Sequence, residues 1–157
     1  MKSDKGVFYL DLFRGKDLQG KWVFGGITSH QHTVGGKTQI VSVNDFIPVR
    51  EETIGQFTGV VFEREDGSRM IFTGDLIKCP IDKSRIIDRF TVGNPNLPDS
   101  LIGIVKYDPI SASYRILFPD NDMGIISTGF GWANDKVMEL VGNIHDNPEL
   151  ASLFNDK

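Results

Sequence analysis

Short runs of alternating apolar and polar residues, separated by glycine, proline, asparagine and aspartate, recur along the chain. The clearest stretch is 54–79, where two apolar runs flank an Asp-Gly turn at 66–67 and a corner at Gly74 and Asp75 opens a third run. A period of two places successive side chains on opposite faces of a strand, and such turns join antiparallel strands. The stretch therefore predicts three strands of one β unit.

The same signal predicts further antiparallel hairpins and one last strand. The expected pairs are 7–13 with 21–24, 32–34 with 39–43, and 102–107 with 113–118, and the last strand covers 136–144. In the 102–118 hairpin one face is expected to carry Val105, Tyr107, Tyr114, Ile116 and Phe118. Because proline cannot donate a ladder hydrogen bond, Pro48 confines the run before it to an edge strand or a loop.

One short amphipathic helix is expected to close the chain. Asn147 is placed to cap it, Pro148 fits the first helical position, and Glu149 suits the positive end of the helix dipole. Leu150, Leu153 and Phe154 follow at helical spacing.

Composition agrees with a strand-rich fold. Eleven phenylalanines and 17 glycines accompany frequent valine, isoleucine and threonine, and 157 residues suffice for one domain with its own core. We predict a single domain over 1–157 of mainly β (β-rich α+β) class. Its antiparallel hairpins are expected to form a partly closed barrel. The corner Gly74-Asp75-Leu76-Ile77, followed later by Gly103-Ile104-Val105, resembles one that recurs in SH3-like barrels, and this analogy implies an SH3-like arrangement.

Three residues of the central stretch are interpreted as structural turn positions. Gly59 and Gly74 sit where the chain changes direction between apolar runs, and glycine accepts backbone conformations that other residues avoid. Asp75 can accept hydrogen bonds from nearby backbone N–H groups, as in an Asx turn.

Charge narrows the choice of partners. The formal net charge of −4 disfavours a protein whose whole surface attracts phosphates, but a local basic patch is still compatible with it. The candidate macromolecule-binding residues are Lys78, Lys83, Arg85, Arg89 and Phe90. Basic and aromatic groups together suit nucleic acid, whereas the alternative is a charged strand edge that resists aggregation.

The connection over 80–100 is long for a compact domain. Connections of this length without clear secondary structure are often binding loops or flaps. We therefore interpret it as the best candidate in the chain for a moving or docking element.

Catalytic signatures are weak. His30 and His32 could share one side of a strand and bind a metal with Asp45 or His145, but they also fit an exposed polar loop. The candidate carboxylate pairs lie in expected turns. The phosphate-binding motif Gly-x4-Gly-Lys-Ser/Thr and the dinucleotide-binding motif Gly-x-Gly-x-x-Gly do not occur between a strand and a helix in this sequence. We predict no catalytic, cofactor or metal site, no cofactor requirement, and a protein that is not an enzyme.

Cys79 is the only cysteine, so no internal disulfide can form, and it is interpreted as a small apolar residue at a strand end. The N-terminal apolar run is short and flanked by acids, unlike a signal peptide, and no run is long enough to cross a membrane. The expected location is the cytoplasm of a bacterial host cell.

Four separated blocks resemble, in order and spacing, the YopX family of phage and prophage proteins. They are LFRGKDLQGKWVFGGI at 12–27, IGQFTGVVFEREDGSRMIFTGDLIKC at 54–79, IGIVKYD at 102–108 and LVGNIHDNPELA at 140–151. The chain departs from the family pattern at Val60-Val61-Phe62, at Thr73 and in a longer 80–100 segment. The resemblance implies a mobile-element origin and a β-rich fold, and it implies no reaction.

The expected function is that of a non-enzymatic phage or prophage accessory protein that forms a homo-oligomer and binds a macromolecule, either a host or a phage protein. The alternative is a nucleic-acid-binding module that uses the basic 78–90 region. No membrane partner is expected.

Overall fold

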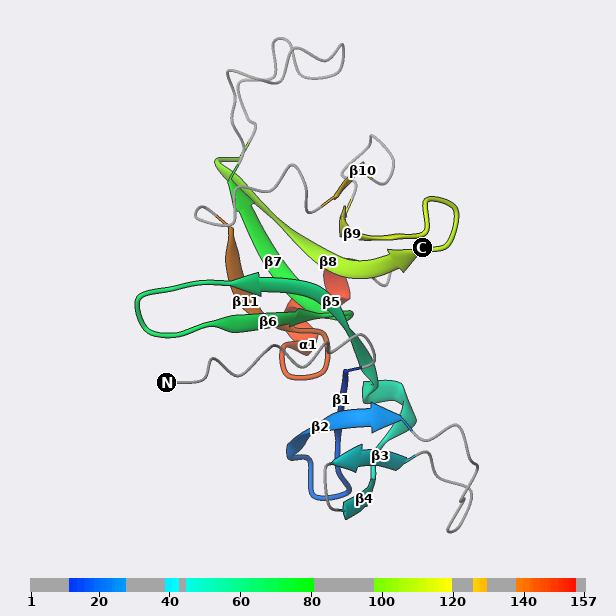
Figure 1. Cartoon of the computed structure of the whole chain (residues 1–157). Coiled ribbons are helices and arrows are strands. Elements are labelled where there is room, and N and C mark those ends of the chain that lie inside the picture. The colour runs from blue at the N-terminus through cyan, green and yellow to red at the C-terminus, as the bar shows by residue number, and fades with distance from the viewer. Residues whose placement is uncertain are drawn as a thin grey trace, which may run out of the picture. The chain divides into compact units, whose positions relative to one another are not determined.

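The computed structural model describes residues 12–27, 39–42, 45–80, 98–119, 126–129 and 138–154. The chain divides into two compact units, residues 1–60 and residues 61–157. Both units are built from antiparallel strands (Figure 1), and the expected mainly β class is confirmed.

The first unit contains four strands and most of a fifth. They are β1 (Phe13–Lys16), β2 (Trp22–Ile27), β3 (Gln39–Ser42), β4 (Asp45–Pro48) and β5 (Gly55–Phe62), with a 3₁₀ turn, η1 (Glu51–Thr53), before β5. The sheet order is β4-β3-β2-β1-β5, and β5 continues into the second unit, where β6 (Arg69–Phe72) is the last strand in that order.

The expected first hairpin is confirmed as β1 and β2, with Lys16 aligned to Trp22. Its turn is held by Asp17, whose carboxylate accepts the N–H groups of Gln19 at 2.9 Å and Lys21 at 2.8 Å. The strand includes Arg14 to Lys16, which the sequence pattern assigned to its end, because these residues pair with β2. The earlier part of the expected strand lies outside the described residues.

The remaining strands of this unit follow from the same pattern. β3 pairs with β2 and β4, and β4 ends the sheet order, as expected for a strand that contains Pro48. The 32–34 strand of the expected second hairpin lies outside the described residues. Thr53 joins η1 to β1, because its hydroxyl accepts the Lys16 N–H at 2.8 Å and donates to the Arg50 carbonyl at 2.6 Å.

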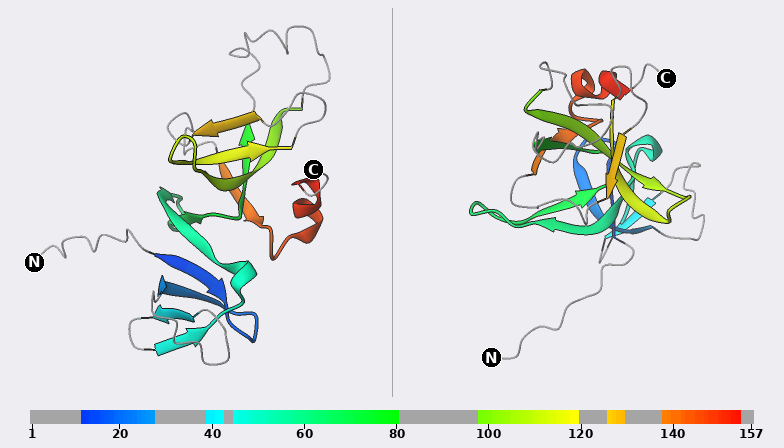
Figure 2. Two further views of the ribbon diagram at one scale, coloured as in Figure 1. Left: turned by 90° about the vertical axis from the view of Figure 1, so that its right-hand side faces the viewer. Right: turned by 90° about the horizontal axis from the view of Figure 1, so that it is seen from above.

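The second unit holds a five-stranded sheet. Its strands are β7 (Asp75–Pro80), β8 (Ser100–Asp108), β9 (Ser113–Phe118), β10 (Ile126–Gly129) and β11 (Glu139–Asn143), in the order β10-β9-β8-β7-β11. Two further views show the gold β10 beside the yellow β9 (Figure 2).

The buried apolar side chains of the second unit come from β5 and β6 as well as from the five-stranded sheet. They include Phe62, Ile71, Phe72, Leu76, Ile77, Ile104, Val105, Ile116, Phe118 and, just before β11, Met138. Each of the larger ones stabilises the fold by about 1.5–3 kcal/mol relative to exposure. The expected β8–β9 hairpin is confirmed, with Val105 opposite Ile116 and Tyr107 opposite Tyr114.

The described residues end with one helical turn, α1 (Pro148–Ala151), followed by a 3₁₀ turn, η3 (Ser152–Phe154). The helix begins at Pro148, as expected, but the capping prediction for the Asn147 side chain is wrong. Its Oδ1 instead accepts the N–H of Asn143 at 3.2 Å, next to a bulge in β11.

The expected partly closed barrel is not found. The described strands form two open sheets, one ending at β4 and β6 and the other at β10 and β11. Closure requires the end strands to pair, and strand alternation alone does not encode that pairing. Within the described residues, no helix has the length and apolar character needed to cross a membrane.

Candidate functional site

The corner after β6 is fixed by the backbone. Gly74 has a φ of +87°, its N–H donates to the Val105 carbonyl at 2.9 Å, and its carbonyl accepts the Ile144 N–H at 3.0 Å. The buried Asp75 carboxylate accepts the Phe72 N–H at 2.8 Å. The expected hydrogen bond from a nearby backbone N–H to Asp75 is therefore present, and it reaches back across the corner.

A second polar group lies opposite this corner. Asn143 in β11 is aligned with Asp75 in β7. Its Oδ1 accepts the N–H groups of His145 at 2.9 Å and Asp146 at 3.0 Å, and its Nδ2 donates to the Asp146 carboxylate at 2.7 Å. Sequence reasoning missed Asn143, although an asparagine directly before a turn often accepts the backbone N–H two residues further on. These contacts satisfy the backbone N–H groups of His145 and Asp146 and form a structural network.

Position 59 also favours glycine, because its backbone φ of +82° in the middle of β5 is unfavourable for residues that carry a Cβ. The Thr58 hydroxyl beside it accepts the Val60 N–H at 3.2 Å. These values support a structural interpretation of Gly59.

The basic candidates are only partly placed. Lys78 is exposed on β7, aligned with Glu139 on β11 and Ile102 on β8. Lys83, Arg85, Arg89 and Phe90 lie outside the described residues, as do His30 and His32, so the basic surface and the histidine pair stay predictions. In the described part of the chain, no three His, Cys, Asp or Glu side chains gather closely enough to hold a metal ion.

Cys79 is buried within β7, 8% exposed, and burial raises its pKa to about 12. The thiolate is the nucleophilic form of cysteine, and it is scarce at neutral pH when the pKa is this high. Cys79 is therefore suited to packing.

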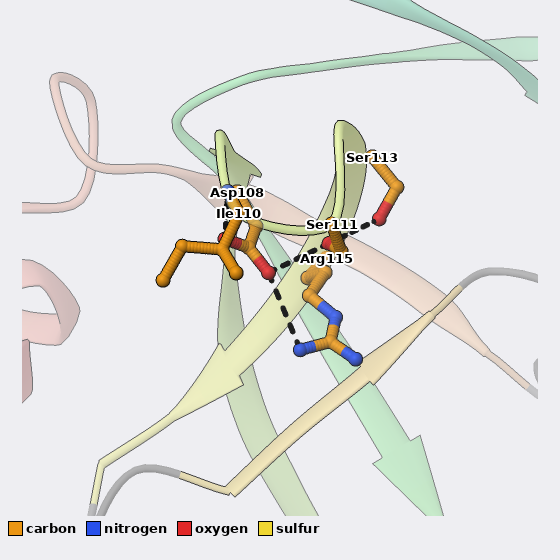
Figure 3. A network of polar contacts seen from close by, with 5 residues as sticks. All are labelled: Asp108, Ile110, Ser111, Ser113 and Arg115. Carbon is orange, nitrogen blue, oxygen red and sulfur yellow. Dashed lines mark hydrogen bonds and ion pairs between the residues drawn. The ribbon is translucent and has the colours of Figure 1, made fainter.

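The connection between β8 and β9 is a loop held by several side-chain hydrogen bonds (Figure 3). The Asp108 carboxylate accepts the Ile110 N–H at 3.0 Å, the Ser111 hydroxyl at 2.6 Å and a guanidinium N–H of Arg115 at 3.4 Å. The Ser111 and Ser113 hydroxyls lie 2.8 Å apart. Hydrogen bonds from Ser111 and Ile110 lower the pKa of Asp108, so its carboxylate is charged at neutral pH and holds the loop.

Two tyrosines stand at the base of this loop. The Tyr107 and Tyr114 rings are 5.3 Å apart with an edge-to-face angle of 65°. Partial burial raises the pKa of Tyr114, and the neighbouring Tyr107 adds to the rise, so its hydroxyl stays neutral. We call residues 107–115 the hairpin end. Its hairpin was predicted from sequence, but its exposed surface was not.

A basic and aromatic cluster lies on the first sheet. The Arg14 guanidinium carbon is 4.7 Å, and the Lys16 ammonium 5.2 Å, from the centre of the Trp22 ring. Arg14 is aligned with Phe24 and Lys16 with Trp22, so the four side chains share one face. From the sequence these residues were predicted only to form a hairpin. The sequence nevertheless shows basic residues alternating on one strand and aromatic residues alternating on the next.

Comparison with known proteins gives a family. The family model described as YopX protein matches residues 12–152, which cover most of both units. No match was found among curated proteins or among solved structures. The chain belongs to the YopX family.

Proposed function

We propose that this chain is a non-enzymatic accessory protein of a phage or prophage that self-associates and binds macromolecules in the bacterial cytoplasm. Membership of the YopX family supports the mobile-element origin. An activity that depends on surfaces is supported by the described side chains, whose polar networks satisfy backbone groups and stabilise turns.

The observation that carries self-association is the edge of β10. Natural sheets protect their end strands with charges, proline or bulges, because an unprotected edge pairs with another chain. β4 contains Asp45 and Pro48, and β11 contains Glu139 and a bulge between Leu140 and Gly142. In the described part of the chain, β10 reads Ile-Ser-Thr-Gly and pairs in continuous register with β9, so its own four residues contain no charge, proline or bulge. We therefore assign the self-association surface to β10.

Two neighbouring proline substitutions test this assignment. Along an antiparallel strand, successive N–H groups point alternately to the partner strand and outward. Of Ser127→Pro and Thr128→Pro, one removes an outward N–H and the other removes a bond to β9. We expect size exclusion with light scattering to show an oligomer for the unmodified chain. The variant that loses only the outward N–H should be a monomer by light scattering and folded by circular dichroism. The variant that loses the bond to β9 should be destabilised.

A clean monomer of the unmodified chain at high concentration would remove the self-association part of the proposal. If both single proline variants are folded and still form the oligomer, the self-association surface does not lie on β10.

The second candidate function is nucleic-acid binding. Lys16, whose ammonium lies 5.2 Å from the centre of the Trp22 ring, favours it, as does the exposed Lys78 of the basic 78–90 region. It predicts a gel shift with a fluorescent single-stranded oligonucleotide that weakens steeply with salt. Lys16→Ala and Lys78→Ala should each reduce the shift, with Glu65→Ala as a control on an exposed turn. No binding at low salt would exclude this function.

A further inference from the structure

The turn between β5 and β6 contains the single aspartate–glycine pair of the sequence, Asp66-Gly67. The sequence has no asparagine–glycine pair. The turn lies at the end of these two strands (Figure 1), and every residue from Glu65 to Met70 is exposed. The Asp66 side chain is 72% exposed, so water reaches its carboxyl group.

An aspartate can react with the backbone nitrogen of the residue that follows it. The nitrogen attacks the side-chain carboxyl carbon, a C–N bond forms, the C–OH bond of the carboxyl group breaks, and the hydroxyl leaves as water with the proton of the nitrogen. The product is a five-membered cyclic imide. Water then opens the imide at either carbonyl, which returns aspartate or gives isoaspartate, whose peptide link runs through the side-chain carbon.

Gly67 leaves this attack unhindered, because a side chain at the following residue would block the approach of its nitrogen to the carboxyl carbon. The φ of Gly67 is +125°, a conformation that favours glycine at this position of the turn. Its N–H donates to the Arg64 carbonyl at 3.1 Å. Such a bond contributes about 0.5–1.5 kcal/mol net, so the nitrogen is released part of the time.

Arg69 restrains the Asp66 carboxylate only weakly. Its Nη2 lies 2.9 Å from Oδ2 of Asp66, and the Arg69 side chain is 45% exposed. An ion pair between exposed side chains stabilises by about 0–1 kcal/mol, so the carboxyl group leaves this contact often enough to meet the nitrogen.

Three other aspartates at turns are protected by their surroundings. Asp75 is buried, and its carboxylate is bonded to backbone. Asp108 precedes Pro109, whose nitrogen carries no hydrogen. Asp17 accepts two backbone N–H groups, and the side chain of Leu18 hinders attack by the nitrogen that follows it. Sequence and exposure together therefore single out the turn between β5 and β6.

We propose that Asp66 converts to isoaspartate in the folded chain through a cyclic imide formed with the Gly67 nitrogen. The new link adds one carbon to the backbone of the turn and moves the carboxylate away from Arg69. β6 begins at Arg69 and carries the buried Ile71 and Phe72, so the change loosens a hairpin that contributes to the core. The reaction involves only this chain and water, so it does not rest on the proposed function.

Ageing of the purified full chain at neutral pH tests the reaction. An isoaspartyl methyltransferase with radioactive S-adenosylmethionine measures the isoaspartate formed, and mass spectrometry of peptides locates it. We expect isoaspartate at Asp66 to accumulate severalfold faster than at Asp17, which serves as the internal control. Asp66→Asn should accumulate it severalfold faster still, because a side-chain amide loses ammonia more readily than a carboxyl group loses water.

Asp66→Glu is the matched control variant, because it keeps the charge but would need a six-membered imide. It should lose most of the methylation signal while keeping the circular dichroism spectrum of the unmodified chain. After ageing, the isoaspartyl form of the unmodified chain, separated by chromatography, should melt at a lower temperature than the fresh protein. Aged Asp66→Glu should keep its melting temperature.

Three results would overturn the proposal. The first is isoaspartate at Asp66 no faster than at Asp17 in the aged native chain. The second is an undiminished methylation signal in Asp66→Glu. The third is accumulation in a parallel sample unfolded in urea with none in the native sample, since the reaction would then belong to the unfolded chain.

Discussion

Gly74 is the residue where backbone geometry decides most. At a φ of +87° a β-branched side chain is strained, and the space is not the obstacle, because an added Cβ would meet Ile144 only at 3.6 Å. We expect Gly74→Val to cost about 2 kcal/mol and to lower the melting temperature by about 4–8 °C. Thermal unfolding followed by circular dichroism measures this.

Gly26 provides the matched control for that change. It lies in β2 with no atom within 4 Å of an added Cβ and without a left-handed φ. Gly26→Val should therefore change the melting temperature little. If the Gly74→Val variant has the same melting temperature as the unmodified chain, the structural interpretation of this corner is wrong.

At this scale the sequence reveals residues whose role is local. Gly74 and Asp75 could be recognised because a tight reversal and a nearby carboxylate act within a few positions of each other. Asn143 and Arg14 could not, because their burial depends on strands distant in sequence. The exposure of Ile110 was equally hidden, since no local pattern separates an apolar loop residue that is covered from one that is not.

At the scale of elements, β8 and β9 pack too closely for any side chain at Gly103. An added Cβ would lie 2.9 Å from the Phe118 ring and closer still to Ile116. Because both neighbours are buried, they cannot move aside freely. We expect Gly103→Ala to destabilise the protein by about 1–3 kcal/mol, measured by urea unfolding.

Gly26→Ala again serves as the control, and it should shift the urea midpoint far less. An equal shift for the two variants would mean that β8 and β9 are not packed as described.

Elements whose signals are local were predicted well. The 102–118 hairpin followed from strict alternation around a short turn, and the helix start followed from Asn147 and Pro148. Long-range features were not. The Asn147 side chain bonds to β11 in place of the helix, and the sheets remain open, because both outcomes depend on partners that the local pattern does not specify.

At the scale of the whole molecule, Cys79 reports on unfolding. Its pKa is raised by burial to about 12 from an ordinary value of 9.0, so the folded state holds the thiol proton more tightly than the unfolded state. This contribution to stability is complete below pH 9 and is lost as the pH rises toward 12. We expect the stability difference between the unmodified chain and Cys79→Ala to shrink over that range.

Alkylation provides the complementary measurement. At pH 8, iodoacetamide should modify Cys79 slowly in the native protein and rapidly in urea. Equal rates in both conditions would show that the thiol is accessible without unfolding.

The last question at this scale is whether the two units unfold together. β5 passes from one unit to the other as a continuous strand, and the YopX match covers both. A strand that belongs to both units cannot lose its order in one without losing support in the other, so we expect one cooperative transition, as the predicted single domain requires.

Trp22 lies in the first unit and Gly74 in the second. With Trp132→Phe as background, Trp22 is the sole tryptophan.

Gly74→Val in that background should lower the Trp22 fluorescence midpoint and the circular dichroism midpoint by the same amount, because destabilising one part of a cooperative domain destabilises the whole. Gly26→Val should leave both midpoints in place. If Gly74→Val shifts only part of the dichroism transition and leaves the Trp22 midpoint unchanged, the units unfold independently and the chain consists of two domains.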